Sequence, residues 1–173
     1  MKTSLPIVLG IVSILSQTAT FAKDLANPAI RYDQFTELTL KLAPVREKNR
    51  ITEEQFIQMS AEPKTIILDA RSKDRYDHIH VKGAVHLAFT DFTEEALRKV
   101  IPDKSTRILI YCNNNFDNEP VDLARKCIVV ALNIQTFINL HAYGYTNVRE
   151  LGPLLDVKTT RIPFVRSDVL PIR

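Results

Sequence analysis

The stretch TIILDAR, residues 65–71, decides the fold that the sequence predicts. Its apolar run is flanked by polar residues, a pattern typical of a strand covered on both faces, as in a parallel sheet. The stretches AVHLAF (84–89) and RILIYC (107–112) have the same pattern, and NVREL (147–151) follows as a further strand. We therefore expect a central, mainly parallel sheet.

Helical patterns alternate with these strands. ITEEQFIQM predicts a helix over residues 53–60, with Thr52 as its N-cap and a glutamine three positions later that completes a capping box. TEEALRKVI (93–101) has acids early, bases late and an apolar face, as an amphipathic helix should. The apolar spacing over 131–143 predicts another helix, with Gly144 in the C′ position. The predicted fold class is α/β, with helices on both faces of the sheet.

The first 22 residues predict an export signal. Lys2 gives a positive start, the run from Leu5 to Leu15 is mostly apolar, and Ala22 is a small residue suited to cleavage after it. A membrane span needs about 20 apolar residues, so a retained anchor is the weaker alternative. Cleavage leaves 151 of the 173 residues, the size of one domain. We expect an exported protein, periplasmic or secreted, that is not held in the membrane after cleavage.

The remaining chain divides into three predicted parts. Residues 23–50 form an N-terminal helical extension, with helical spacing over 32–42 that Pro44 should end. Residues 51–156 carry the alternating pattern of the main domain. Residues 157–173 contain two prolines and little periodicity, and we interpret them as a surface strap.

Charge and histidine spacing exclude two classes of site. The formal charge of +3 falls to +2 when Lys2 is removed, which is too small and too evenly spread for a nucleic-acid partner. His78, His80 and His86 include an H-x-H pair, but no carboxylate or cysteine is placed to complete a metal site. We predict neither a metal nor another cofactor.

Cys112 is the candidate functional residue, because it lies where a predicted strand of an α/β sheet ends. Ligands bind in such sheets outside the carboxyl ends of the strands. Asn113, Asn114 and Asn115 follow it, and asparagine tolerates the left-handed backbone conformation. Turns of that kind would form a nest of N–H groups, which binds anions and favours a thiolate. The alternative is a small apolar residue that closes the core.

The second cysteine, Cys127, makes a disulfide another possible role for Cys112. In an oxidising compartment an even pair is most often a disulfide, and the spacing of Cys112 and Cys127 matches no metal or CxxC pattern. Cys127 is either a partner that resolves an intermediate on Cys112 or a buried apolar residue.

The chain resembles a rhodanese-like domain over roughly residues 50–155. The stretches that carry the resemblance are ITEEQFIQMSAEPKTIILDARSKDRYDHIHVKGAVHLAF, RILIYC and INLHAYGYTNVRELGP. Within them the matching positions are Asp69 and Arg71 of a D-x-R motif, Tyr76, His80 with Gly83 and Ala84, Cys112 at a strand end, and Gly144–Val148.

The resemblance implies that Cys112 is an active-site nucleophile. It would take a sulfane sulfur from a donor such as thiosulfate, hold it as a persulfide and pass it to a thiol or cyanide. Covalent catalysis of this kind splits one transfer into two easier steps. The partners would be a small sulfur-containing anion and a thiol acceptor, and the active-site loop would comprise Asn113, Asn114, Asn115 and Phe116.

The sequence departs from the family pattern after Cys112. The segment from Asn113 to Leu132 is longer than the short loop that the family pattern has before its next helix. Position 118 is Asn, where phosphatase relatives of this fold need an arginine that grips phosphate, so we set that activity aside. Arg125 and Lys126 are candidates for binding an anionic donor, with solvated loop charges as the alternative.

Three further residues have predicted structural roles. We expect Asp69 and Arg71 to form an ion pair at a strand end, and His80 to satisfy backbone groups in a turn.

Two rival functions stay open. One is a non-catalytic rhodanese-like module that binds a protein or a small anion, and the other is a thiol redox protein with a reversible Cys112–Cys127 bridge.

Overall fold

The computed structural model describes residues 27–167. The predicted signal peptide, 1–22, and the last residues of the predicted strap, 168–173, lie outside the described residues. Between residues 27 and 167 no helix has the length and apolar character needed to span a bilayer.

The chain divides into two compact units, residues 1–36 and 37–173, and helix α2 (Tyr32–Lys48) runs across their boundary. In the first unit the described residues form a turn and the first residues of α2. The prediction that Pro44 ends this helix is wrong, because Pro44 lies inside it. Proline removes the N–H that would bond the carbonyl of Leu40. Leu40 is exposed, so water can replace the missing donor there.

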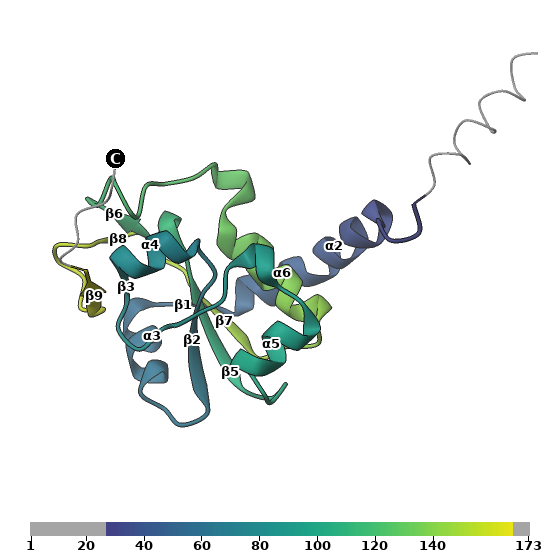
Figure 1. The fold of residues 1–173 in the computed structure, drawn as a ribbon, viewed down its shortest axis with the longest axis horizontal. Helices are drawn as coiled ribbons and strands as arrows, with labels where there is room; N and C mark the ends of the chain where they lie inside the picture. Colours follow the sequence, from purple (N-terminus) through teal and green to yellow (C-terminus); the bar gives the residue numbers. More distant parts are fainter. Residues whose placement is uncertain (1–26, 168–173) are drawn as a thin grey trace, which may run out of the picture. The chain divides into compact units, whose positions relative to one another are not determined.

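The second unit is built on a five-stranded parallel sheet with the order β1-β7-β5-β2-β4 (Figure 1). This confirms the predicted parallel sheet. The strand expected over 84–89 is shorter than its apolar run, because the chain turns into a 3-10 helix at Phe89. The strands are β1 (Arg50–Ile51), β2 (Thr65–Asp69), β4 (Val85–His86), β5 (Arg107–Tyr111) and β7 (Val148–Leu151).

The helices of the second unit form where local sequence signals start and stop them. The predicted capping box is present at α3: the Thr52 N–H donates to Gln55 Oε1 at 2.9 Å, and the Gln55 N–H donates to Thr52 Oγ1 at 3.3 Å. Gly144 has a φ of +84°, the left-handed conformation expected after a helix. The helices are α3 (Glu53–Ser60), α4 (Lys73–His78), α5 (Glu94–Val100) and α6 (Leu132–Ala142), and the sequence analysis did not predict α4.

The sheet separates two apolar cores, because successive residues of a strand point to opposite faces. Leu109 of β5 packs in the first core with Phe56 of α3. Ile110 packs in the second with Leu97 of α5 and Phe137 of α6. Figure 1 shows α5 and α6 on one side of the sheet and α3 on the other, which confirms helices on both faces.

Two small sheets lie outside the main one. Strand β3 (Ile79–Val81) pairs antiparallel with β9 (Phe164–Arg166), and β6 (Phe116–Asp117) pairs parallel with β8 (Leu155–Asp156). The described part of the predicted strap is therefore tied to the domain through β9. Residues 113–131, here called the connecting segment, join β5 to α6 and contain β6 and two 3-10 turns, Asn113–Asn115 and Ile128–Val130.

Candidate functional site

The carboxyl ends of three neighbouring strands bring the candidate residues together. In the parallel register Asp69 of β2 lies beside Tyr111 of β5, and Ile110 lies beside Glu150 of β7. Cys112 follows β5 directly and is 1% exposed. The cysteine is therefore at the edge of the sheet where α/β folds bind ligands.

The side chain of Asn115 fixes the turn after β5. Its Oδ1 accepts the Cys112 N–H at 2.9 Å, and its Nδ2 donates to the carbonyls of Leu151 at 2.7 Å and Pro153 at 3.2 Å. The Asn115 N–H also donates to the Cys112 carbonyl at 3.1 Å. One buried amide thus ties the backbone at the cysteine to the end of β7.

The backbone of the three asparagines differs from the prediction. A left-handed nest is wrong, because Asn113, Asn114 and Asn115 form a right-handed 3-10 turn, and the non-glycine residues with positive φ between residues 27 and 167 are Lys64 and Asn118. The bonds made by Asn115 close the turn in this conformation. Amide donors nevertheless reach the sulfur, one from the turn and one from the start of α6.

Burial dominates the electrostatics of Cys112. It raises the pKa of the thiol, whereas hydrogen bonds from the backbone N–H groups of Asn133 and Asn114 lower it. The charge of Glu150 raises the pKa and that of Arg71 lowers it, and the net shift is upward. The amides act in the direction that we predicted for the loop, but burial outweighs them, so Cys112 rests as a thiol at neutral pH.

The raised pKa gives a testable pH dependence. Only the thiolate reacts with an alkylating reagent, so the alkylation rate of Cys112 should still be rising with pH above about 8.5, the ordinary pKa of a free thiol. The rate is measured by mass spectrometry with iodoacetamide, on protein in which the exposed Cys127 is replaced by serine. A rate that levels off below neutral pH would show a stabilised thiolate instead.

A buried polar cluster lies beside Cys112. Glu150 is 4% exposed, and its Oε1 accepts from Arg46 Nη2 at 2.6 Å and from Asn133 Nδ2 at 3.5 Å. Asn133 Nδ2 also donates to Asn115 Oδ1 at 2.9 Å, which joins this cluster to the turn at Cys112. The second carboxylate oxygen of Glu150, Oε2, is buried and has no hydrogen-bond partner among residues 27–167.

A cavity of about 320 Å³ adjoins the cluster. It has room for a small anion or a small thiol. Its lining contains two cations, one carboxylate and the Cys112 thiol, and the other side chains are asparagine amides or aliphatic groups. The residues that matter for the chemistry are Cys112, Asn114, Asn133, Glu150, Arg46 and Arg125.

The family model described as the rhodanese-like domain matches residues 52–152. The chain belongs to the rhodanese-like family. Membership supports a sulfurtransferase-like role at the level of the family. None of the curated proteins compared with the chain matches it.

Three solved structures of low identity are similar to this chain. The Alr3790 protein from Anabaena sp. is 20% identical, with a TM-score of 0.48 over 69% of this chain and 94% of its own. A complex of EanB with ergothioneine covalently linked to a persulfide is 21% identical, with a TM-score of 0.50 over 68% of this chain and 28% of its own. A rhodanese with anions from E. coli is 22% identical, with a TM-score of 0.39 over 60% of this chain and 99% of its own.

In this rhodanese-like domain Asp69 and Arg71 form a buried ion pair. Arg71 Nη2 lies 2.6 Å from Asp69 Oδ2 and donates to the carbonyl of Ile79 at 2.5 Å. The hydroxyl of Tyr111 donates to the same Asp69 oxygen. Burial alone would lower the pKa of Arg71, but Asp69 outweighs it and raises that pKa, so the guanidinium stays charged. The pair joins β2, β3 and β5 and does not line the Cys112 cavity.

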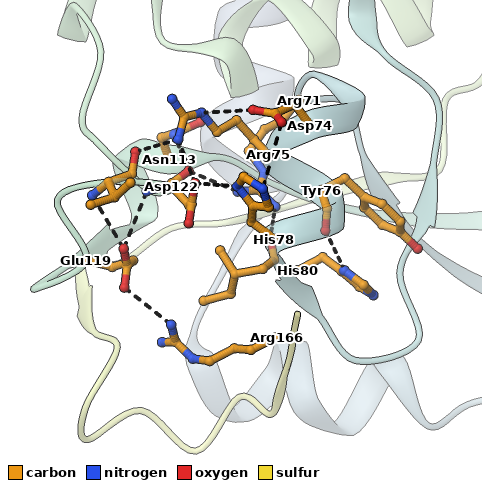
Figure 2. Close-up of polar contacts among 12 residues, drawn as sticks. Arg71, Asp74, Arg75, Tyr76, His78, His80, Asn113, Glu119, Asp122 and Arg166 are labelled. Carbon is orange, nitrogen blue, oxygen red and sulfur yellow. Dashed lines mark hydrogen bonds and ion pairs between the residues drawn. The ribbon is translucent and has the colours of Figure 1, made fainter. Parts of the chain in front are cut away.

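Asp122 anchors the connecting segment of the rhodanese-like domain to α4. Its Oδ1 accepts from Arg75 Nη1 at 2.6 Å and lies 3.1 Å from His78 Nδ1, and its carbonyl accepts from Asn113 Nδ2 at 3.2 Å. Figure 2 shows these side chains around Asp122. Burial would raise the pKa of Asp122, but the bonds to His78 and Arg75 together lower it. The ionised carboxylate is therefore what holds the segment.

Removing that charge should release the connecting segment. We expect Asp122→Asn to raise the rate of tryptic cleavage after Arg125 and Lys126 by about ten-fold, the effect of losing one charge-assisted hydrogen bond on a local opening equilibrium. Asp117→Asn is the matched control, because its contact with Arg125 is exposed and 3.9 Å long. Equal cleavage rates in the two variants would show that Asp122 does not anchor the segment.

The two candidate cations of the segment lie in different places. Arg125 lines the Cys112 cavity. Lys126 instead lines a second cavity with Arg71. The backbone of Lys126 is fixed by the Asn114 side chain, which accepts its N–H at 2.9 Å and donates to its carbonyl at 2.9 Å. Of the pair, Arg125 is therefore the residue placed to meet a ligand of Cys112.

The other predicted residues lie away from that cavity. Phe116 is buried in the first core against Tyr111 and Phe164. His80 stacks on Tyr76 with ring centroids 3.9 Å apart, and its Nδ1 lies 2.7 Å from the Tyr76 carbonyl. Cys127 is exposed and Cys112 is buried, and both are free thiols.

Three residues of the cluster were not predicted from the sequence. Arg46 belongs to the predicted extension, Asn133 to the start of α6, and Glu150 to the strand predicted over 147–151, in a sheet predicted to have helices on both faces. A carboxylate in such a strand is itself a signal, because a buried charge needs partners. Arg46 carries no comparable signal, since its partner lies 104 positions along the chain.

Proposed function

We propose that this chain is a sulfurtransferase that carries a sulfane sulfur on Cys112, moving it from a thiosulfate-like donor to a thiol or cyanide acceptor. One observation carries the proposal. Cys112 directly follows β5, lines a cavity of about 320 Å³, and receives hydrogen bonds on its sulfur from two backbone N–H groups, those of Asn114 and Asn133.

The first half of the proposed reaction loads the cysteine. Cys112 loses its proton and the thiolate attacks the outer sulfur of thiosulfate. A new S–S bond forms, and the bond to the sulfonate sulfur breaks, so that sulfite leaves with the electron pair and takes up the proton as hydrogen sulfite. The two N–H groups that reach the cysteine can stabilise the negative charge of the persulfide. Arg125 lines the cavity, and its charge would attract the anionic donor.

The test is the intact mass of the reduced protein before and after thiosulfate. We expect a gain of one sulfur atom that dithiothreitol removes, and peptide mapping should place it on the peptide that contains Cys112. No gain, with Cys112 still a free thiol, would favour a module that binds a protein or an anion. A disulfide between Cys112 and Cys127 would favour a thiol redox protein.

We also infer that the protein is exported. Residues 1–22 support this, with their positive start, apolar run and small residue at the expected cleavage position. N-terminal sequencing of protein from the periplasmic fraction or medium of an expressing bacterium should begin at Lys23. An unprocessed chain that stays in the cytoplasmic fraction would contradict export.

A further inference from the structure

Two buried acceptor oxygens beside Cys112 have no donor. They are Oε2 of Glu150 and Oδ1 of Asn133, and neither has a partner among residues 27–167. The amide orientation of Asn133 is fixed by its neighbours. The Cys112 N–H can only donate, so it defines Oδ1 of Asn115 as an acceptor, and Asn133 must present its Nδ2 there.

Unpaired buried acceptors are costly unless a donor reaches them. Asn133 and Glu150 both line the cavity that Cys112 lines, and each is 4% exposed. A ligand with a hydrogen to give would satisfy these two oxygens. An anion with acceptor atoms alone would suit only Arg46 Nε, the one donor of the lining that is buried without a partner among residues 27–167. The cavity therefore has the chemistry of a site for a proton donor next to a reactive sulfur.

We propose that Glu150 accepts the proton of a neutral thiol that takes the sulfur from Cys112, which makes a protonated thiol, and not an anion such as sulfite, the preferred acceptor. This rests on the proposed function, because it concerns the second half of the same transfer. Glu150 is a catalytic residue in this proposal, and Arg46 and Asn133 are positioning residues that hold its Oε1 and leave its Oε2 free.

The proposed step balances in protons and charge. The acceptor S–H bond breaks and its proton moves to Glu150 Oε2, while the acceptor sulfur bonds the outer sulfur of the persulfide anion. The bond between the two sulfurs on Cys112 breaks, and its electron pair stays on Cys112 Sγ. Glu150 then returns the proton to Cys112, whose pKa burial raises, and a persulfide anion of the acceptor leaves.

The charges that face Glu150 support this choice of acceptor. Arg46 of α2 pairs with it, and Arg125 of the connecting segment lines the same cavity. Cys112, directly after β5, is close enough for the Glu150 charge to raise the pKa of its thiol. With a persulfide anion on Cys112, two cations and two anions balance. A neutral thiol keeps that balance, whereas a sulfite dianion adds charge that nothing in the cavity neutralises.

The experiment separates loading from transfer. Wild type and Glu150→Gln are loaded with thiosulfate, freed of excess donor, and checked for one added sulfur by intact mass. The loaded proteins are then mixed with β-mercaptoethanol or with sulfite, and loss of the sulfur is followed in a single turnover. We expect the loaded wild type to lose its sulfur faster to the thiol than to sulfite at equal concentration.

Transfer to the two acceptors should respond differently to the loss of the Glu150 charge. A free thiol with a pKa of about 8.5 is roughly one-thirtieth thiolate at neutral pH, so Glu150→Gln should slow thiol transfer there by about ten- to thirty-fold. At high pH, where the thiol ionises unaided, the two proteins should converge. Transfer to sulfite should stay equal or become faster, because the variant removes a repelling charge.

Three outcomes would overturn the proposal. They are an unchanged rate with the thiol, an equal loss with both acceptors, and a loss with the thiol that persists at high pH. Failure of the wild type to load would instead refute the proposed function. If Glu150→Gln does not fold, the proposal is tested on the wild type, by measuring its transfer rate to a series of thiols of different pKa. The single-turnover rate at neutral pH should depend only weakly on thiol pKa, and a rate in proportion to the thiolate fraction would overturn the proposal.

Discussion

Replacing Cys112 by serine is expected to lower thiosulfate-dependent sulfur transfer by about 10³-fold or more, because no other residue of the cavity can carry the sulfur. Serine has nearly the size of cysteine, and the bond that Asn115 accepts comes from the backbone N–H at this position. The turn after β5 should therefore survive the exchange. The measurement is the steady-state rate of thiosulfate consumption with a thiol or with cyanide as acceptor.

Cys127→Ser is the matched control for this prediction. Cys127 is exposed and takes no part in the cavity, so its loss should leave the rate unchanged. Activity that survives in Cys112→Ser would contradict the proposed function. Activity that is lost equally in both variants would point to the redox alternative, in which the two thiols act as a pair.

Arg71→Met is expected to cost about 3–5 kcal/mol of unfolding free energy, the usual effect of removing one partner from a buried ion pair. Asp69 would keep its charge in a site where it is 0% exposed, with the hydroxyl of Tyr111 as its remaining side-chain donor. The carbonyl of Ile79 would also lose the donor that now reaches it at 2.5 Å. Urea denaturation of the purified variant, compared with wild type, measures the loss.

Lys73→Met provides the comparison for Arg71→Met. Lys73 pairs with Asp77 on the surface of α4, where the two side chains are 66% and 51% exposed. Exposed ion pairs contribute little, so this variant should unfold at the same urea concentration as wild type. Equal destabilisation of the two variants would show that burial of the Asp69–Arg71 pair does not determine its contribution to the free energy of unfolding.

Local signals explain why much of the fold could be predicted from sequence. The capping box at Thr52 and the left-handed turn at Gly144 depend on neighbours within a few positions, and both occur where predicted. Helix α4 was missed because KDRYDH has no apolar face to give it a period. The prediction from Pro44 failed because a helix can accommodate a proline where water reaches the freed carbonyl, as at the exposed Leu40.

The site was harder to predict because it depends on contacts between distant residues. A strand end can be recognised from sequence, so Cys112 could be chosen. The amide of Asn115 accepts from Asn133 and donates to Leu151, 18 and 36 positions away. No spacing rule relates those positions. The pKa of the thiol could not be predicted for the same reason, since it depends on how deeply the folded chain buries the sulfur.

The ion pair between Arg46 and Glu150 indicates when the cavity forms during folding. It joins residues 104 positions apart, so the wall beside Cys112 does not exist until β7 has been synthesised and has docked between β1 and β5. Contacts that close so long a loop form late, because their entropic cost is met only when the rest of the sheet is in place. A nascent chain that ends before β7 therefore carries its cysteine without a cavity around it, and the surroundings that set the pKa of that thiol exist only in the finished fold.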